Sequence, residues 1–324
     1  MSGPRRRRGV WLAVLAAAAA LEAGAPDPIR AEEPTESDEE AEEAQLLTAL
    51  ERALIQRGGL LLPPWRVEIE PSLTYTQSTR QTLATDDAGV AFTERVQRDT
   101  LDPEVTFRLG LPWRLQLATT VPFRYERQRT VIADSAEETR DRFGLGDVDV
   151  ELSAHLLQER GLLPDLLASA RWKSTTGEGP FEVGPGEIPL GTGFDAIEVT
   201  LTATRSRDPV VFIVDLTYTV NVSTATSLGR IDPGDEIGYA LGLVLALNPE
   251  TSLDLTFEHR FARHTTLAGE QVPGTSESIG LVSLGTSYVL ARNVSLDLSV
   301  GFGVTADAPD VQVTLAVPVR FPPR

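Results

Sequence analysis

The sequence of 324 residues has no cysteine, one methionine and three histidines. Without cysteine the chain can form no disulfide and offers neither a thiol nucleophile nor a thiolate metal site. The histidines, His155, His259 and His264, show no H-E-x-x-H or H-x-x-x-H spacing, so no metal site and no cofactor is expected. Basic residues are also few, 29 against 47 acidic ones, and the net charge of −18 makes nucleic acid an unsuitable partner.

Long hydrophobic runs are missing as well. The one apolar run, Val10 to Leu21, follows four arginines and precedes the small residues Ala-Gly-Ala at 23–25. This order is typical of a secretory signal peptide, and the run is too short for a membrane-spanning helix. We therefore expect a signal peptide at residues 1–31; the alternatives are a membrane anchor or a buried poly-alanine helix.

Residues 32–63 are expected to form an acidic segment followed by a short helix in the periplasm. EEPTESDEEAEE has almost no apolar residue, whereas the stretch that follows places Leu47, Leu50 and Leu54 at helical spacing before a Gly-Gly pair. The helix predicted over 44–57 would be either a spacer at the mouth of the next domain or a surface for self-association or a periplasmic partner.

The remainder, residues 64–324, is dominated by alternating patterns. VVFIVDLTYTVNV, residues 210–222, places Val, Phe, Val, Leu, Tyr, Val and Val on one row and Val, Ile, Asp, Thr, Thr and Asn on the other. A period of two indicates a strand with one apolar and one largely polar face. A soluble sandwich would bury the apolar face, whereas an outer-membrane barrel would turn it towards lipid.

Twelve such segments are predicted, joined by connections of alternating length. The strands are expected at residues 65–76, 102–111, 114–126, 146–158, 165–175, 196–206, 210–222, 236–248, 252–264, 278–290, 294–305 and 311–321. Short turns alternate with longer polar loops at 77–101, 127–145, 176–195, 223–235 and 265–277. This alternation is typical of an antiparallel up-and-down transmembrane β-barrel, and an even number of strands places the N- and C-termini together in the periplasm.

Strand length and side-chain chemistry favour the membrane barrel over a secreted sandwich. Most segments have 10–13 residues, which suits a bilayer crossing of about 9–11 tilted residues better than the globular mean of about 5–6. Charged residues on the polar rows would line a wet lumen: Arg124, Glu126, Asp147, Asp149, Glu151, Arg171, Lys173, Glu198, Asp215, Asp254, Glu258, Arg260, Asp297 and Arg320. Aromatic residues near the strand ends would form a girdle at each membrane interface: Trp65, Tyr75, Phe123, Tyr125, Trp172, Tyr218, Tyr239, Phe257, Tyr288 and Phe321.

The last segment supports the same fold. VQVTLAVPVRFPPR places alternate residues from Val313 to Phe321 on one apolar face. It resembles the terminal strand by which outer-membrane barrels are recognised, so the barrel-assembly machinery and outer-membrane lipid are the expected partners. It differs in the Pro-Pro-Arg that follows Phe321, since such strands usually stop on the aromatic residue.

Several segments together resemble a known bacterial family. RGGLLLPPWRVEIEPSLTYTQS, GLPWRLQLATTVPFRYE, GLGDVDVELSAHLL and GTGFDAIEVTLTATRS are similar to the outer-membrane barrel family labelled putative meta-pathway of phenol degradation, whose members are often named transporters. The resemblance covers nearly all of residues 55–321, and its most telling motif is GLGD at 144–147 before an alternating strand. It implies an outer-membrane barrel and the passage of aromatic or other small organic molecules.

No enzyme active site is predicted. An outer-membrane phospholipase needs a serine and a histidine paired on the lipid face, but no serine follows His259 in an H-x-S arrangement and no asparagine is placed to orient its ring. The glycine-rich segment 177–193 lacks the Lys-Ser/Thr ending of a phosphate loop and is expected to be an exposed loop.

One acidic row permits two interpretations. Asp147, Asp149 and Glu151 alternate along one strand, where they would either bind a cation or pair with Arg171 and Lys173 on the next strand. In both cases they belong to the predicted lumen. The sequence thus predicts a channel that passes small solutes by passive or gated diffusion; the alternative is a non-conducting structural or docking barrel of the envelope.

Overall fold

The computed structural model describes residues 54–55, 59–85, 91–132, 136–184, 186–226 and 229–321. The chain divides into two units, residues 1–41, which lie outside the described residues, and residues 42–324. The predicted signal peptide and the acidic segment lie outside the described residues, as does all of the predicted helix except Leu54 and Ile55. Within the described ranges, no helix is long and apolar enough to cross a membrane.

Strands make up most of the described chain. In order, the elements are β1 (Val67–Thr85), β2 (Ala91–Leu111), the 3-10 helix η2 (Pro112–Arg114), β3 (Leu115–Ile132), β4 (Ala136–Leu145), β5 (Asp149–Leu157), β6 (Asp165–Lys173), β7 (Ala196–Arg207), β8 (Val210–Asn221), β9 (Thr224–Thr226), β10 (Gly229–Asp232), β11 (Glu236–Asn248), β12 (Thr251–Ala262), β13 (Thr266–Leu267), β14 (Glu270–Gln271), β15 (Glu277–Ala291), β16 (Val294–Gly303), β17 (Val311–Ala316) and β18 (Val319–Phe321).

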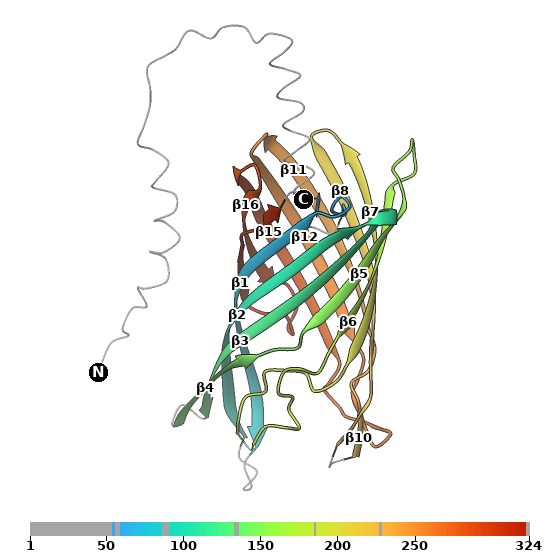
Figure 1. The fold of residues 1–324 in the computed structure, drawn as a ribbon. Helices are drawn as coiled ribbons and strands as arrows, with labels where there is room; N and C mark the ends of the chain where they lie inside the picture. The colour runs from blue at the N-terminus through green and yellow to red at the C-terminus, as the bar shows by residue number, and fades with distance from the viewer. Residues whose placement is uncertain are drawn as a thin grey trace, which may run out of the picture. The chain divides into compact units, whose positions relative to one another are not determined.

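The long strands close into a barrel of twelve antiparallel strands, which confirms the predicted fold. Two of the twelve are interrupted, because β4 and β5 follow one another along β3, and β17 and β18 together form the last strand. The last strand pairs with the first, with Tyr75 opposite Val313 and Glu68 opposite Arg320. Figure 1 shows the strands tilted around the barrel.

The apolar rows face outwards. On β8, Phe212, Val214 and Leu216 are 48%, 41% and 57% exposed, whereas Val211 and Ile213 on the other row are 0% and 4% exposed. A continuous exposed row of large apolar side chains would be unfavourable in water but is the normal outer surface of a barrel in lipid. The alternation in this strand therefore has the orientation of a membrane barrel and not that of a soluble sandwich.

The predicted long loop at 77–101 is wrong, because most of it is strand. β1 and β2 continue as a paired hairpin from Gln77 opposite Asp99 to Thr85 opposite Ala91. In a membrane barrel, apolar and polar residues alternate along the part of a strand where one face meets lipid and the other meets the lumen. Beyond the bilayer both faces are wet, so the sequence pattern disappears while backbone pairing continues.

Two further strand boundaries differ from those predicted, each for its own local reason. The predicted loop 127–145 is occupied by the end of β3 and by β4, which pair along the same polar extension. The predicted last strand 311–321 is broken at residues 317–318, where Pro318 cannot donate a backbone hydrogen bond. There the amide of Val317 bonds to the carbonyl of Pro71, and the carbonyl of Pro318 accepts from Ser295.

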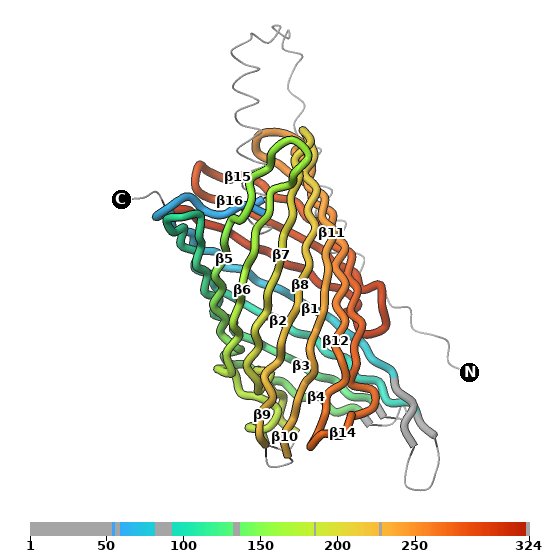
Figure 2. The backbone as a smooth tube through the Cα atoms, turned by 90° about the vertical axis from the view of Figure 1, so that its right-hand side faces the viewer, coloured from blue at the N-terminus to red at the C-terminus, as the bar shows by residue number. Residues whose placement is uncertain are grey.

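The two ends of the barrel differ. One end carries short turns such as 248–251, where Asn248 Oδ1 accepts from the amides of Glu250 and Thr251 at 2.9 and 2.8 Å. The other end carries the β4 extension and a small separate sheet of β9, β10, β13 and β14. Figures 1 and 2 show β4, β9, β10 and β14 together at this end, which we call the long-loop end.

Candidate functional site: the barrel lumen

The charged residues predicted for the lumen lie inside the barrel. Thirteen of them line its internal cavities: Arg124, Glu126, Asp147, Asp149, Glu151, Arg171, Lys173, Glu198, Asp215, Asp254, Glu258, Arg260 and Asp297. The remaining one, Arg320, forms an ion pair with buried Glu68. Period-2 alternation placed them on one common face, because side chains two residues apart on a strand share a face.

The lumen is a series of adjoining polar cavities. Two central cavities of about 480 and 550 Å³ share Arg171 in their lining, and a third of about 290 Å³ shares Glu70 with the first. Towards the long-loop end, a cavity of about 460 Å³ shares Asp102 and Arg124 with the first. Each volume is near or within the range of about 300–1,000 Å³ that small-molecule sites occupy.

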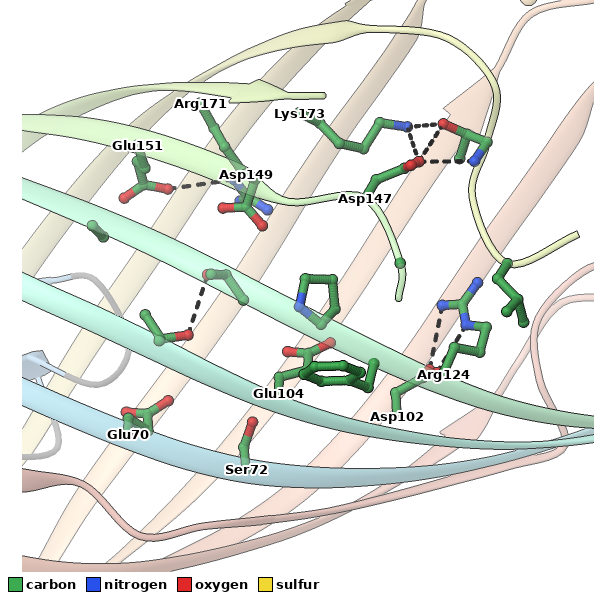
Figure 3. Close-up of a pocket in the computed structure, with 18 of the residues that line it drawn as sticks. Glu70, Ser72, Asp102, Glu104, Arg124, Asp147, Asp149, Glu151, Arg171 and Lys173 are labelled. Carbon is green, nitrogen blue, oxygen red and sulfur yellow. Dashed lines mark hydrogen bonds and ion pairs between the residues drawn. The ribbon is translucent and has the colours of Figure 1, made fainter. Parts of the chain in front are cut away.

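Cross-strand ion pairs order the walls of the first central cavity (Figure 3). Arg124 Nε donates to Asp102 Oδ1 at 2.8 Å, and Arg171 lies 2.7 Å from Glu198 and 3.4 Å from Glu151. Of the two interpretations of the acidic row, the structure shows the cross-strand pairing. Among the described residues, no group of three or more His, Asp or Glu side chains is arranged to hold a metal ion.

Five lumen residues that were not predicted from the sequence lie on the first two strands. They are Glu68, Glu70, Asp102, Glu104 and Arg108, which line the first cavity or support its wall. The signal was present, since all five occupy the polar row of a predicted strand. Arg108 Nη1 lies 2.7 Å from both Glu68 and Glu70, so these side chains form a connected network.

At the short-turn end the inner wall becomes apolar and contacts the segment that precedes β1. Leu54 is buried against Val211, Ile213 and Val244, and Leu60 packs on the same cluster. These wall residues occupy the row that is otherwise polar, so here the lumen excludes water. Leu54, which belongs to the helix expected to be either a spacer or a docking surface, is therefore buried inside the barrel.

Hydrogen bonds and a close backbone approach hold this segment in place. Leu62, 3% exposed, donates its amide to Gln116 Oε1 at 2.9 Å, and the amide of Trp65 bonds to the carbonyl of Gly110 at 2.7 Å. A Cβ at Gly110 would lie 2.1 Å from the carbonyl oxygen of Pro63, so only glycine permits this contact. We call residues 54–55 and 59–64 the entry segment.

The glycine-rich loop before β7 is not wholly exposed, contrary to the prediction. Ile188 and Leu190 are each 4% exposed, and Arg142 on β4 donates to the carbonyl of Ile188 at 2.9 Å. Phe143 on β4 is 63% exposed on the outside of the barrel. Its neighbours along the strand, Arg142 and Gly144, therefore face the lumen. The loop therefore lies against the inner wall, where Leu190 contributes to the first cavity.

The aromatic residues predicted for the girdle lie on the outside of the wall. Seven are at least 37% exposed, namely Trp65, Tyr75, Phe123, Trp172, Tyr218, Tyr288 and Phe321; Tyr125, Tyr239 and Phe257 occupy outward rows with intermediate burial. Tyr218 donates to Asp235 at 2.6 Å near the long-loop end, and Tyr288 donates to Glu250 at 3.2 Å at the short-turn end. Their hydroxyl groups thus point to polar partners at both rims, as interfacial tyrosines do.

His259 has partners on the outer face that the sequence did not reveal. Its Nε2 lies 3.0 Å from Ser278 Oγ on β15, and its Nδ1 lies 3.3 Å from the hydroxyl of Tyr239 on β11. The sequence offered no serine in an H-x-S arrangement after His259, and the serine that pairs with it comes from a neighbouring strand. The amide of Ser278 donates to Asp307 Oδ2, so that amide is already engaged and is not oriented towards a developing oxyanion.

The chain belongs to the family described as "Putative MetA-pathway of phenol degradation", which matches residues 72–321. Among solved structures, the chain is similar to the COG4313 outer membrane channel from Pseudomonas putida F1, with a TM-score of 0.60 at 14% identity over 81% of this chain and 97% of that chain. It is also similar to the translocator domain of the autotransporter NalP from Neisseria meningitidis, with a TM-score of 0.46 at 12% identity over 88% and 98% of the two chains. The resemblance suggested by the sequence motifs is confirmed, and the fold is a closed antiparallel barrel of twelve strands.

Proposed function

We propose that this chain is a gated diffusion channel of the outer membrane for small organic solutes. The observation that carries the proposal is the series of adjoining charged cavities that leads from the long-loop end to the centre. The third cavity continues the series to Val244, against which Leu54 of the entry segment packs. A structural barrel would gain more stability from a packed apolar interior than from these hydrated cavities.

The family description supports aromatic or similar small molecules as the solutes. The long-loop end would face the cell exterior and both termini the periplasm, consistent with twelve strands and with short turns on the inner side. The C-terminal strand would be the element recognised during barrel assembly, after export directed by residues 1–31. The entry segment would then close the periplasmic mouth and provide the gate.

We also propose that the chain has no enzymatic activity. A serine–histidine pair among the described residues, Ser278 and His259, lies on the lipid-facing surface among Tyr239, Phe257 and Phe261, whose rings pack around the imidazole. This packing is suited to ordering the aromatic girdle. Retention of conductance without ester hydrolysis by the purified protein would agree with this assignment.

The test is single-channel conductance of the folded mature protein in a planar bilayer, compared with the variant Leu54→Glu/Leu60→Glu. Two buried carboxylates would expel the entry segment from its apolar site, so the variant is expected to conduct more often than the wild type. Leu162→Glu is the matched control, because Leu162 is 86% exposed in a short turn. Silence of all three folded proteins would reject the channel and favour a non-conducting docking barrel.

A further inference from the structure

The loop that joins β6 to β7 lies on the lumen side of β4. We call its described residues, 174–184 and 186–195, the inner loop. Leu190 covers Gly144 so closely that a Cβ at Gly144 would lie 2.6 Å from its Cδ1. Arg142 holds the same stretch through the carbonyl of Ile188, and it also forms an ion pair with Glu178.

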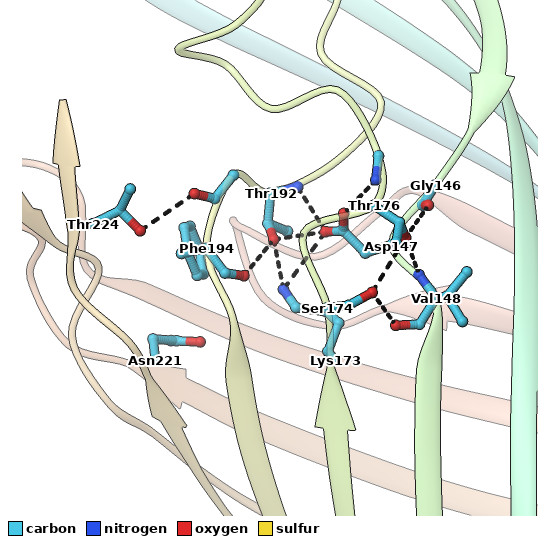
Figure 4. Close-up of polar contacts among 12 residues, drawn as sticks. Gly146, Asp147, Val148, Lys173, Ser174, Thr176, Thr192, Phe194, Asn221 and Thr224 are labelled. Atoms are coloured by element: carbon cyan, nitrogen blue, oxygen red, sulfur yellow. Dashed lines mark hydrogen bonds and ion pairs between the residues drawn. The ribbon is translucent and has the colours of Figure 1, made fainter. Parts of the chain in front are cut away.

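One carboxylate connects the two ends of the inner loop (Figure 4). Asp147 Oδ1 accepts the amide of Gly177 at 3.0 Å. Its Oδ2 accepts the amide and the hydroxyl of Thr192 at 2.8 and 2.7 Å. The side chain of Asp147 is only 6% exposed, so these bonds to a charged acceptor form away from bulk water and are stronger than exposed ones.

The two ends of the loop cross directly above this carboxylate. A Cβ at Gly177 would lie 2.8 Å from the Cα of Gly191, and a Cβ at Gly191 would lie 2.6 Å from Asp147 Oδ1. Lys173, at the end of β6, donates to Thr192 Oγ1 at 2.7 Å and lies 4.0 Å from Asp147 Oδ2. The amides of Leu190 and Gly191 also donate to the carbonyl of Glu178 at 3.0 Å and join the two ends to each other. The Asp147 carboxylate adds the bonds that join the crossing to the bend between β4 and β5.

The anchored loop forms part of the surface that solutes would pass. Leu190, Thr192 and Lys173 line the first central cavity together with Glu104 and Asp149. If the loop left the wall, this side of the lumen would lose its lining and become wider. The width of the passage thus depends on whether the inner loop stays attached.

We infer that Asp147 is a positioning residue that fixes the inner loop against the wall and thereby limits the size of the solutes that pass. The inference rests on the proposed channel function and extends it to a determinant of specificity. It assigns a physical role to the aspartate of the GLGD stretch, at the bend between β4 and β5. Asparagine at this position keeps the shape but offers one acceptor oxygen in place of two, so part of the crossing loses its partner.

The first experiment compares Asp147→Asn with Glu104→Gln in planar bilayers and in liposomes loaded with neutral polymers of graded size. Both variants remove one negative charge from the same cavity, but Glu104 has no hydrogen bond or ion pair to the inner loop in the structure. We expect Asp147→Asn to raise conductance about twofold and to admit larger polymers, because selectivity in a channel follows the pore lining and its radius. Glu104→Gln should shift ion selectivity and leave the polymer cut-off unchanged.

A second experiment separates loop position from channel activity. Because the chain has no cysteine, the double variant Gly144→Cys/Leu190→Cys can form one disulfide only, and its formation reports the loop on the wall without any measurement of current. In the triple variant that also carries Asp147→Asn, the oxidised disulfide should restore the wild-type polymer cut-off. Reduction of the disulfide should raise the cut-off again. Rescue by a tether distinguishes positioning from a general loss of stability.

The outcomes are distinct. Absence of the disulfide in folded protein would overturn the placement of the loop. A disulfide that forms while Asp147→Asn behaves like Glu104→Gln would overturn the role of Asp147 and leave the channel proposal intact. Loss of conductance in every variant, including those with a displaced entry segment, would reject the channel function and with it the size limit, although the disulfide would still report the loop position.

Discussion

The carboxylate of Glu68 lies between two guanidinium groups, accepting from Arg108 Nη1 at 2.7 Å and from Arg320 Nε at 2.6 Å. Glu68 is on the first strand and Arg320 on the last, and the two residues are directly opposite where the barrel closes. The side chain of Glu68 is 0% exposed. A charge at this depth is tolerated only when it is paired, so the seam of the barrel is specified electrostatically as well as by backbone pairing.

Substitution of Glu68 by alanine should destabilise the folded barrel by about 3–5 kcal/mol, because it leaves Arg320 buried without its carboxylate. Urea unfolding in detergent micelles, followed by tryptophan fluorescence, measures the effect. The control is Glu137→Ala, which removes an exposed partner of Arg129 at 3.0 Å and should cost about 0–1 kcal/mol. Equal unfolding midpoints for the two variants would show that the seam does not depend on the pair.

Neighbouring residues on β8 should differ in how much the same substitution destabilises the barrel. Leu216→Arg places a charge on the lipid face near the middle of the strand and should cost about 2–4 kcal/mol of stability in lipid. Thr217→Arg points into the wet lumen and should cost much less. Comparing both variants by unfolding in phospholipid vesicles checks the orientation, and a reversed order would mean that the rows face the other way.

Gly110→Ala should open the channel more often. The added methyl group has no room against the carbonyl of Pro63, so the entry segment must move away from the wall. The measurement is open probability in single-channel recordings. Gly238→Ala is a suitable control, since Gly238 is also on an inward row and its added Cβ would meet its nearest atom at 3.4 Å, an ordinary contact distance. An unchanged open probability in Gly110→Ala would show that the entry segment does not control the opening of the channel.

Lumen charges should set ion selectivity with a predictable sign. Asp215→Asn removes a negative charge from the second central cavity and should make the channel less selective for cations. Arg124→Gln removes the partner of Asp102 and should make it more selective for cations. Reversal potentials under a salt gradient measure both shifts, which should weaken at high salt because screening shortens the range of these charges. Shifts of the same sign in both variants would contradict a lumen lined by these residues.

Much of the barrel could be predicted because its environment repeats every two residues. The row from Phe212 to Val222 and the charged row that includes Asp215 follow from alternation alone, since one face meets lipid and the other water. The same rule would have identified Glu68 and Glu70. Alternation fails at 77–101, where water on both sides removes the contrast although β1 and β2 remain paired.

The sequence by itself determined the twelve strands, the apolar and the polar face of each, and the family, because these depend on local periodicity and short motifs. The tertiary structure decided which distant residues meet: Glu68 with Arg320, Leu54 with Val211, and Asp147 with Thr192. Closure of the barrel brings these residues together from strands and loops far apart in the chain. No period in the sequence encodes such contacts, since each depends on strand register and on the space left inside the closed wall.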